Sequence, residues 1–497
     1  MLLPALVERE LYDVARAHHD EHPEGPAVER IVDWIGAFIP RVMFPASLAA
    51  AAREAGAEPL WTGRPRPYAE STLRLAATRL DARGAWVHVA DAVWKQVTTA
   101  VAMVDDEIVA YTDMFDQPYF TRKFAHAAPI GRLGNRLLAG TCFGWTTVAL
   151  PGGPTLFAHL SWHKPASPLR DALEDLFEDD TRMAWWHAHV RLHILDRGAN
   201  GDAVLQWLWN WEVPYLTIGR KGADLWRFHT PTARNAQGLP FVVRPDARLD
   251  GDADEGPWEV IVPARPDDAA GTRGLRFRAA VPLDEAALLG LNAQYKSRWP
   301  SMENELKALQ SRGFGRNRSR RLELTVSRGT DGEIARLREQ EAAQCATLDV
   351  QGAEPASPRT LRRVSAMARK ITATRAKRER LAETAPRKHA RVEGGAERLG
   401  KWLHLLVHNA QKLALASSPD EAVRAMEPDT VFALLLGRSA LTCVETGRLT
   451  LWVEALDGAE DRARQAALVA TFNQLKLRCR GRDVVVHLRE RAATSAA

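Results

Sequence analysis

Hydrophobic positions between residues 288 and 309 follow the spacing of one amphipathic helix. Large apolar side chains recur there every three or four residues: Leu288, Leu289, Leu291, Tyr295, Trp299, Met302, Leu306 and Leu309. Side chains at this spacing share one face of a helix. Arg298, Glu303 and Lys307 fall on neighbouring turns of the same segment. The pattern therefore predicts a helix that places one carboxylate between two cations, which suits a divalent metal beside a phosphate.

An apolar run that ends at an aspartate predicts the first of two strands. Residues 190–195 form a short β-like run, Asp196 follows it, and Gly198 permits a sharp exit. Residues 204–208 then have helical spacing, and a second strand-like run occupies 214–218. This order indicates a strand–helix–strand unit with Asp196 at the end of its first strand, where α/β sheets bind ligands.

A second aspartate follows a similar run. Residues 107–112 are apolar and rich in β-formers, and Asp113 comes next, with Asp116 close enough to be the alternative acid. Two strand-borne aspartates and the helix-borne Glu303 are the residue types that hold a pair of divalent metal ions. Such a pair stabilises both the attacking and the leaving oxygen of an in-line phosphoryl displacement.

Three local patterns, centred in turn on these three acids, carry a resemblance to a known family. Their residues are Tyr111, Thr112 and Asp113 with Pro118, Tyr119 and Lys123; Leu195, Asp196, Arg197 and Gly198 with Trp207, Leu208, Pro214 and Tyr215; and Tyr295, Arg298, Trp299, Glu303, Asn304 and Lys307. Over roughly residues 105–310, the chain resembles the cut-and-paste DDE transposases of bacterial insertion sequences. One departure is that four residues separate Arg298 from Glu303, where the family has three.

The resemblance implies a fold and a chemistry. The fold is α/β, with an RNase H-like mixed sheet flanked by helices. Asp113, Asp196 and Glu303 would be the catalytic acids and would hold two Mg²⁺ ions, for which Mn²⁺ can substitute. The implied reaction is metal-dependent cleavage at the ends of the element, followed by transfer of the freed 3′-hydroxyl to target DNA.

The resemblance also implies partners. These are DNA, both as terminal inverted repeats and as target, and a second copy of the chain, because two ends must be joined. Arg298 and Lys307 would clamp phosphates, and Tyr295 would contact a phosphate near the cut. Two alternatives stay open: a catalytically inactive DNA-binding protein that keeps the fold, and an unrelated hydrolase or scaffold whose acids match by chance.

Positive charge is concentrated in one stretch of the chain. The net charge is only +5, with a pI of about 9.1, yet residues 359–391 hold twelve basic side chains against Glu379 and Glu383. Charge of this density suits a phosphate backbone, although a solvated helix is the alternative. Arg316 and Arg318 lie directly after the glutamate helix, and this position favours DNA contact.

Residues 220–281 predict a β-rich insertion between the second aspartate and the glutamate helix. Their β-like runs alternate with turn-rich pieces such as 250–256. Trp226 and Trp258 are candidates for stacking on DNA bases, which is worth roughly 1–3 kcal/mol per base. Burial in a small core of the insertion is the other interpretation for both.

The pattern divides the chain into five predicted parts. A helical N-terminal domain at 1–97, with a break marked by Pro40, is a possible binder of DNA ends. The RNase H-like core takes 98–219 and 282–345 around the insertion at 220–281. A basic helical or linker segment at 346–400 and a small α/β C-terminal domain at 401–497, in which strands at 448–453 and 483–488 flank a helix at 462–475, complete the prediction.

Cysteine usage and hydropathy exclude several classes of protein. The cysteines Cys142, Cys345, Cys443 and Cys479 are far apart, which indicates neither a zinc site nor a disulfide framework. No apolar run reaches membrane-spanning length, and the first residues lack a signal-peptide core. We therefore expect a cytoplasmic protein with no membrane partner.

Overall fold

The structure is a computed structural model of the 497-residue chain. It describes residues 2–43, 61–64, 66–118, 130–133, 136–163, 167–199, 201–219, 233–234, 240–249, 256–263, 274–281, 285–312, 314, 321–326, 329–352, 358–382, 388–393, 396–431, 434–435 and 440–490. The architecture is mixed α/β, and this part of the sequence prediction is confirmed.

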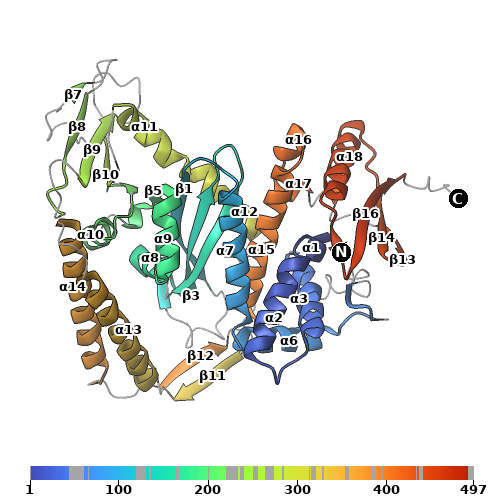
Figure 1. Ribbon diagram of the computed structural model, residues 1–497, viewed down its shortest axis with the longest axis horizontal. Coiled ribbons are helices and arrows are strands. Elements are labelled where there is room, and N and C mark those ends of the chain that lie inside the picture. The colour runs from blue at the N-terminus through green and yellow to red at the C-terminus, as the bar shows by residue number, and fades with distance from the viewer. Residues whose placement is uncertain are drawn as a thin grey trace.

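A mixed sheet forms the centre of the molecule (Figure 1). Its first strands are β1 (Ile108–Pro118), β3 (Arg136–Ala149), β4 (Thr155–His163), β5 (Val190–Leu195) and β6 (Tyr215–Ile218). The strands lie in the order β4-β3-β1-β5-β6. β3 is antiparallel to both β4 and β1, whereas β5 and β6 run parallel to β1. The predicted strand–helix–strand unit is therefore present as β5, α10 and β6.

The described strands of the predicted insertion extend this same sheet. β10 (Gly274–Ala279) pairs antiparallel with β6, and β9 (Trp258–Pro263), β8 (Pro240–Pro245) and β7 (Ala233–Arg234) follow in turn. At the opposite side, β2 (Ile130–Leu133) pairs with the first residues of β3. The segment at 220–281 thus continues the central sheet.

Helices cover both faces of the sheet. On one face, α8 (Leu169–Leu176), α9 (Asp180–His189) and α10 (Asp202–Asn210) enclose a hydrophobic cluster, and the short 3₁₀ turn η3 (Arg197–Ala199) follows Asp196. On the other face, α15 (Glu397–Ala416) packs against β4, and the segment at 285–311 that carries Glu303, called the glutamate segment, packs against β3. α7 (Ala85–Val101) also packs against β4, and its last residues join the first cluster.

The helices at the start of the chain pack against one another and against α15. They are α1 (Leu2–Leu6), α2 (Glu8–Glu21), α3 (Val28–Met43), α6 (Glu70–Ala82) and α7 (Ala85–Val101). The break predicted at Pro40 is wrong, because α3 continues through this proline to its end. Only the last turn follows Pro40, and the Arg41 guanidinium supports that turn by donating to the carbonyl of Ala37 at 2.6 Å.

A helical hairpin on a two-stranded ribbon crosses the boundary between the predicted catalytic core (282–345) and the predicted basic segment (346–400). α13 (Gly329–Gly352) and α14 (Pro358–Ala382) pack along each other, and β11 (Arg321–Val326) pairs antiparallel with β12 (Lys388–Glu393) at their base (Figure 1). α14 also contacts α10, where guanidinium groups lie over two tryptophan rings. Part of the basic stretch therefore packs within the protein.

α15 (Glu397–Ala416) is a buried helix that contacts α3, α6, α7 and β4. Most of its side chains are buried, polar ones included. The short helices α16 (Glu421–Arg424) and α17 (Pro428–Val431) follow and pack back onto it. Although the sequence pattern assigned most of α15 to a C-terminal domain, its contacts are largely with the helices at the start of the chain and with β4.

The C-terminal sheet contains β13 (Ala440–Glu445), β14 (Arg448–Glu454), β15 (Arg478–Cys479) and β16 (Arg482–Arg489). The parallel strands β14 and β16 are joined through α18 (Ala459–Gln474), which packs on β16, as the sequence pattern predicted. Among the described helices, none is both long enough and apolar enough to cross a bilayer.

Candidate active site

The register of two parallel strands brings the two aspartates together. β1 pairs with β5 as far as Thr112 opposite Leu195, so Asp113 and Asp196 are the next residues on adjacent strands. Beyond this point β5 ends, whereas β1 continues to Pro118 along β3. Asp113 therefore lies within its strand, beside a place where the neighbouring strand has stopped. The side of β1 that faces β5 is therefore unpaired at Asp113, at the end of the parallel pair.

The segment that carries Glu303 differs from the single regular helix that the apolar pattern predicted. It consists of α11 (Glu285–Lys296), the π-helical turn η5 (Trp299–Glu303) and α12 (Asn304–Ser311). The N–H of Asn304 donates to the carbonyl of Trp299, five residues earlier. Pro300 lies inside this turn and has no N–H to continue the α-helical pattern. One wider turn therefore interrupts the helix, as in the π-bulges that are frequent at functional sites.

The π turn accounts for the unusual spacing of Arg298 and Glu303. Residues five apart in a regular α-helix are separated by about 140° around its axis, so their side chains point in different directions. The wider turn absorbs the extra residue, and Nη2 of Arg298 lies 3.1 Å from Oε1 of Glu303. The four-residue spacing thus still brings arginine and glutamate together.

One guanidinium joins all three predicted acids. Nη1 of Arg298 lies 3.1 Å from Oδ2 of Asp113 and 2.7 Å from Oδ1 of Asp196, while Nη2 contacts Glu303. The Arg298 side chain is 13% exposed, and those of the three acids are between 21% and 34% exposed. The cluster therefore holds three carboxylates around one cation, and it stays accessible from solvent.

Burial and neighbouring charges together perturb the ionisable groups of the cluster. Burial raises the pKa of Asp113 to about 7, the charge of Asp196 adds to this rise, and Arg298 opposes it. Burial disfavours the charged form of Arg298, but the surrounding carboxylates, Asp196 foremost, outweigh burial and raise the pKa of this arginine. Burial also raises the pKa of Tyr295 to about 12, and the Arg298 guanidinium lies 5.5 Å from the centre of its ring.

The residue types of the cluster suit a metal ion, whereas their present arrangement does not. Carboxylate oxygens are the ligands that Mg²⁺ prefers, and the three acids converge from two strands and one helix. Within the described ranges, however, no group of three or more His, Cys, Asp or Glu side chains is arranged to hold a metal. Arg298 lies where the three acids converge, so the residues fit a magnesium site in chemistry and would hold the ion only if Arg298 moves aside.

The remaining predicted DNA contacts are distributed around this cluster. Lys307 is exposed, and its Nζ lies 4.7 Å from the ring centre of Trp299, which is 54% exposed. Trp258 is half-buried against the main hydrophobic cluster, and not in a separate small core of the insertion. Trp226, Arg316 and Arg318 lie outside the described residues.

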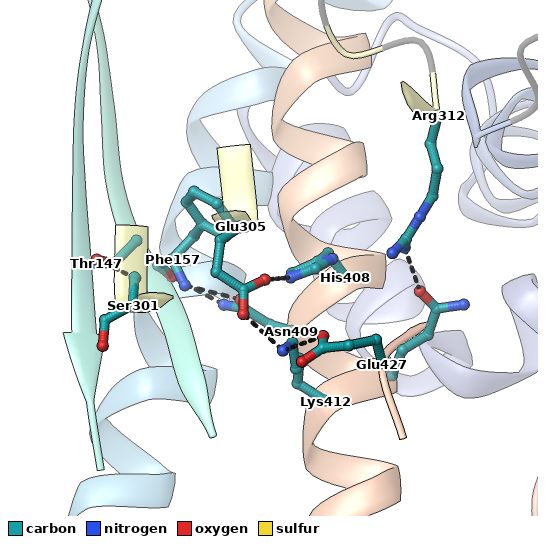
Figure 2. Close-up of polar contacts among 10 residues, drawn as sticks. Thr147, Phe157, Ser301, Glu305, Arg312, His408, Asn409, Lys412 and Glu427 are labelled. Atoms are coloured by element: carbon teal, nitrogen blue, oxygen red, sulfur yellow. Dashed lines mark hydrogen bonds and ion pairs between the residues drawn. The ribbon is translucent and has the colours of Figure 1, made fainter. Parts of the chain in front are cut away.

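Sequence reasoning missed a buried polar network on the far side of the glutamate segment. Glu305 is buried, and its carboxylate accepts hydrogen bonds from His408 and Lys412 of α15 (Figure 2). Burial would raise the pKa of Glu305, but the hydrogen bond from His408 and the charge of Lys412 outweigh it and lower that pKa. A signal was present: Glu305 lies three residues after Met302 and four before Leu309, within the apolar stripe.

No protein-family model matches this chain, and no curated protein sequence matches it. The geometry of the cluster is therefore what indicates the class of site. Three acids converge from β1, the end of β5 and a π turn, and they carry more negative charge than Arg298 neutralises.

Proposed function

We propose that this protein is a DDE-type DNA transposase, an enzyme that cleaves and joins DNA strands with the help of divalent metal ions. The convergence of Asp113, Asp196 and Glu303 on Arg298 is the observation that carries the proposal. The acids are distant in sequence and come from separate elements, so their meeting is a property of the fold. An uncompensated acidic cluster open to solvent is what binding of Mg²⁺ beside phosphate requires.

The fold supports the same proposal. A mixed sheet with helices on both faces agrees with an RNase H-like core. In chain order, β7 to β10 come between the second aspartate and the glutamate segment, where the resemblance expects a β-rich insertion. The two aspartates follow the last paired residues of β1 and β5, at the edge where α/β sheets bind ligands.

The acids and the arginine have separate roles in this proposal. Asp113, Asp196 and Glu303 would hold two Mg²⁺ ions, which would supply charge stabilisation for the attacking and leaving oxygens. Arg298 leaves the carboxylates and binds the phosphate at the cut, because its planar fork matches phosphate oxygens as well as carboxylates. Lys307 adds a point charge on the exposed side of the same segment.

The reaction transfers a phosphoryl group twice. Water first attacks a phosphodiester at the end of the element, which breaks the bond to the 3′ oxygen and releases a 3′-hydroxyl. That hydroxyl then attacks a phosphodiester in target DNA, and the new bond to the element's 3′ oxygen forms as the bond to the target strand's own 3′ oxygen breaks, which leaves a 3′-hydroxyl on the target. A homodimer on DNA, with one site for each end, satisfies the need to join two ends. No covalent protein intermediate is required.

Nicking of supercoiled plasmid in Mg²⁺ or Mn²⁺ tests the proposal directly. The wild-type protein should nick, and the Asp196→Ala variant should bind DNA without nicking. Asp20→Ala is a matched control, because Asp20 is exposed on α2, away from the three acids. Loss of nicking in both variants, or equal nicking in all three proteins, would reject the assignment of Asp196.

A DNA-binding protein without catalysis is the second candidate, and one observation favours it. Arg298 neutralises part of the acidic cluster in the way that a structural ion-pair network does. This candidate predicts DNA binding with no cleavage in any divalent metal, including on a substrate that carries the ends of its own element. An unrelated hydrolase or scaffold would instead have no strongly salt-dependent affinity for DNA.

A further inference from the structure

Glu305 is a buried carboxylate only two residues beyond Glu303, and it faces away from the acidic cluster. Its Oε2 accepts a hydrogen bond from Nε2 of His408 at 2.9 Å, and its Oε1 accepts one from Nζ of Lys412 at 2.6 Å. The Glu305 side chain is 7% exposed and that of His408 is fully buried. Lys412 also contacts Glu427, at 2.7 Å, so its charge is shared with a carboxylate near the surface (Figure 2).

The helix that holds Glu305 is itself fixed to the central sheet. Asn409 follows His408 on α15, and its side chain forms two hydrogen bonds with the backbone of Phe157 on β4, at 2.9 Å and 2.8 Å. The rings of Phe157 and His408 meet edge to face, with their centres 5.4 Å apart. Neighbouring residues of α15 thus bind the glutamate segment and the sheet, as Figure 2 shows.

Two further contacts attach the glutamate segment to the strands. The hydroxyls of Tyr111 on β1 and Ser297 lie 3.0 Å apart, and Thr147 on β3 donates to the carbonyl of Ser301 at 3.3 Å. Residues 297, 301 and 305 therefore form a row of polar contacts at four-residue intervals, and the π turn lies within that row. Glu305 is the last of these contacts and the only one of the three with ionic hydrogen bonds among the interactions described here.

We propose that Glu305, held by His408 and Lys412, is a positioning residue that sets the place of Glu303 and Arg298 relative to the two aspartates. This inference rests on the proposed function. A charged group at the site must be held to within about 0.5 Å by its supporting contacts. Residues that support metal-binding side chains in this way typically change metal affinity or activity by about 10–100-fold when they are replaced.

Glu305→Gln and Lys412→Met test the role of this network, and Glu259→Gln is their matched control. Glu259 is also a buried carboxylate with two cationic partners, Arg244 on β8 and Arg276 on β10. It lies on β9, which contacts α11, and its described ion pairs are with these strands and not with η5 or α12. All three variants should lose stability. Only the two network variants should also lose about 10–100-fold in nicking rate at saturating DNA, with a higher Mn²⁺ concentration for half-maximal rate.

A conservative replacement separates positioning from simple loss of stability. Lys412→Arg keeps the positive charge and should recover part of the nicking rate that Lys412→Met loses, while KM for DNA changes little in either. The inference is overturned if the network variants lose only stability, as Glu259→Gln does, and nick at the wild-type rate.

Hydrogen exchange of the amides at 298–309 gives a readout that does not depend on catalysis. Exchange should be faster in Glu305→Gln than in the wild type under native conditions, and it should be unchanged there in Glu259→Gln. Unchanged exchange in Glu305→Gln overturns the inference whether or not the protein nicks DNA. Faster exchange together with an inactive wild type supports the positioning role and counts against the transposase proposal alone.

Discussion

Glu303 and Glu305 lie two residues apart on one helical segment, yet their surroundings are opposite in character. Glu303 shares a single guanidinium with two other carboxylates, and its side chain is 23% exposed. Glu305 receives one hydrogen bond from a histidine and one from a lysine, and it is almost fully buried. The first carboxylate belongs to a cluster with excess negative charge, and the second has its charge compensated.

The difference separates a functional group from a supporting one. A buried carboxylate persists in a fold when donors and a countercharge compensate it, and Glu305 meets that condition. The acidic cluster does not, because burial and Asp196 raise the pKa of Asp113 to about 7 despite the nearby Arg298. A carboxyl pKa perturbed in this way is typical of functional sites, where a bound ligand can compensate the negative charge.

Exchanging the two glutamates for alanine should give the largest effect. Glu305→Ala leaves Lys412 and His408 without their buried partner and should lower the free energy of unfolding by about 3–5 kcal/mol. Glu303→Ala removes one of three mutually repelling carboxylates and should change stability by less than about 0.5 kcal/mol. Urea unfolding of both variants measures the difference. Equal losses would show that the two carboxylates contribute equally to the free energy of unfolding, which would contradict the difference between their surroundings.

Activity should reverse that ranking. Glu303→Gln removes a proposed ligand charge while keeping the size of the side chain, and it should reduce Mg²⁺-dependent nicking by at least about 10²-fold. Its unfolding transition should match that of the wild type, which shows that the loss is chemical. A Glu303→Gln protein that nicks at a rate within twofold of the wild type would remove Glu303 from the site.

Asp113 should make stability depend on pH in the metal-free protein. Its pKa is about 7 when folded and near 3.8 in the reference state. Because the folded pKa is the higher one, its contribution to stability is fully present below about pH 3.8 and is lost as the pH rises through about 7. The free energy of unfolding of the wild type should therefore fall relative to that of Asp113→Asn by up to about 1.4 kcal/mol per pH unit.

Unfolding of the two proteins at several pH values between 5 and 8, in the presence of a chelator, provides this measurement. Parallel curves for the wild type and Asp113→Asn would contradict the raised pKa. A second comparison with saturating Mn²⁺ should remove the slope, because a bound cation favours the ionised carboxylate.

Lys307 should have the smallest effect of the set. Its side chain is exposed beside Trp299, so Lys307→Ala should change stability by less than about 0.5 kcal/mol. If Lys307 binds a phosphate, the variant should bind all DNA sequences more weakly. The slope of the logarithm of the binding constant against the logarithm of the salt concentration should also become smaller in magnitude by about one. Lys476→Ala, at an exposed lysine just after α18, is the control and should leave both quantities unchanged.

Much of the secondary structure follows from the sequence pattern. The apolar runs before Asp113 and Asp196 predicted β1 and β5, and the strand–helix–strand order of the C-terminal unit was also predicted. The three acids could be chosen because residue type, order and position at strand ends are local properties of the chain. The same local information misplaced a helix break at Pro40, since a proline in a last turn removes too little hydrogen bonding to end a helix that packs well.

The sequence by itself therefore determined which residues carry charge, which elements hold them and where extra spacing occurs. Only the tertiary structure decided that β1 and β5 pair in the register that makes Asp113 and Asp196 neighbours. It also decided that a π turn returns Glu303 to Arg298, and that α15 supplies the partners of Glu305. These contacts join residues up to 107 positions apart, and their free energy depends on burial and on neighbours that no local pattern specifies.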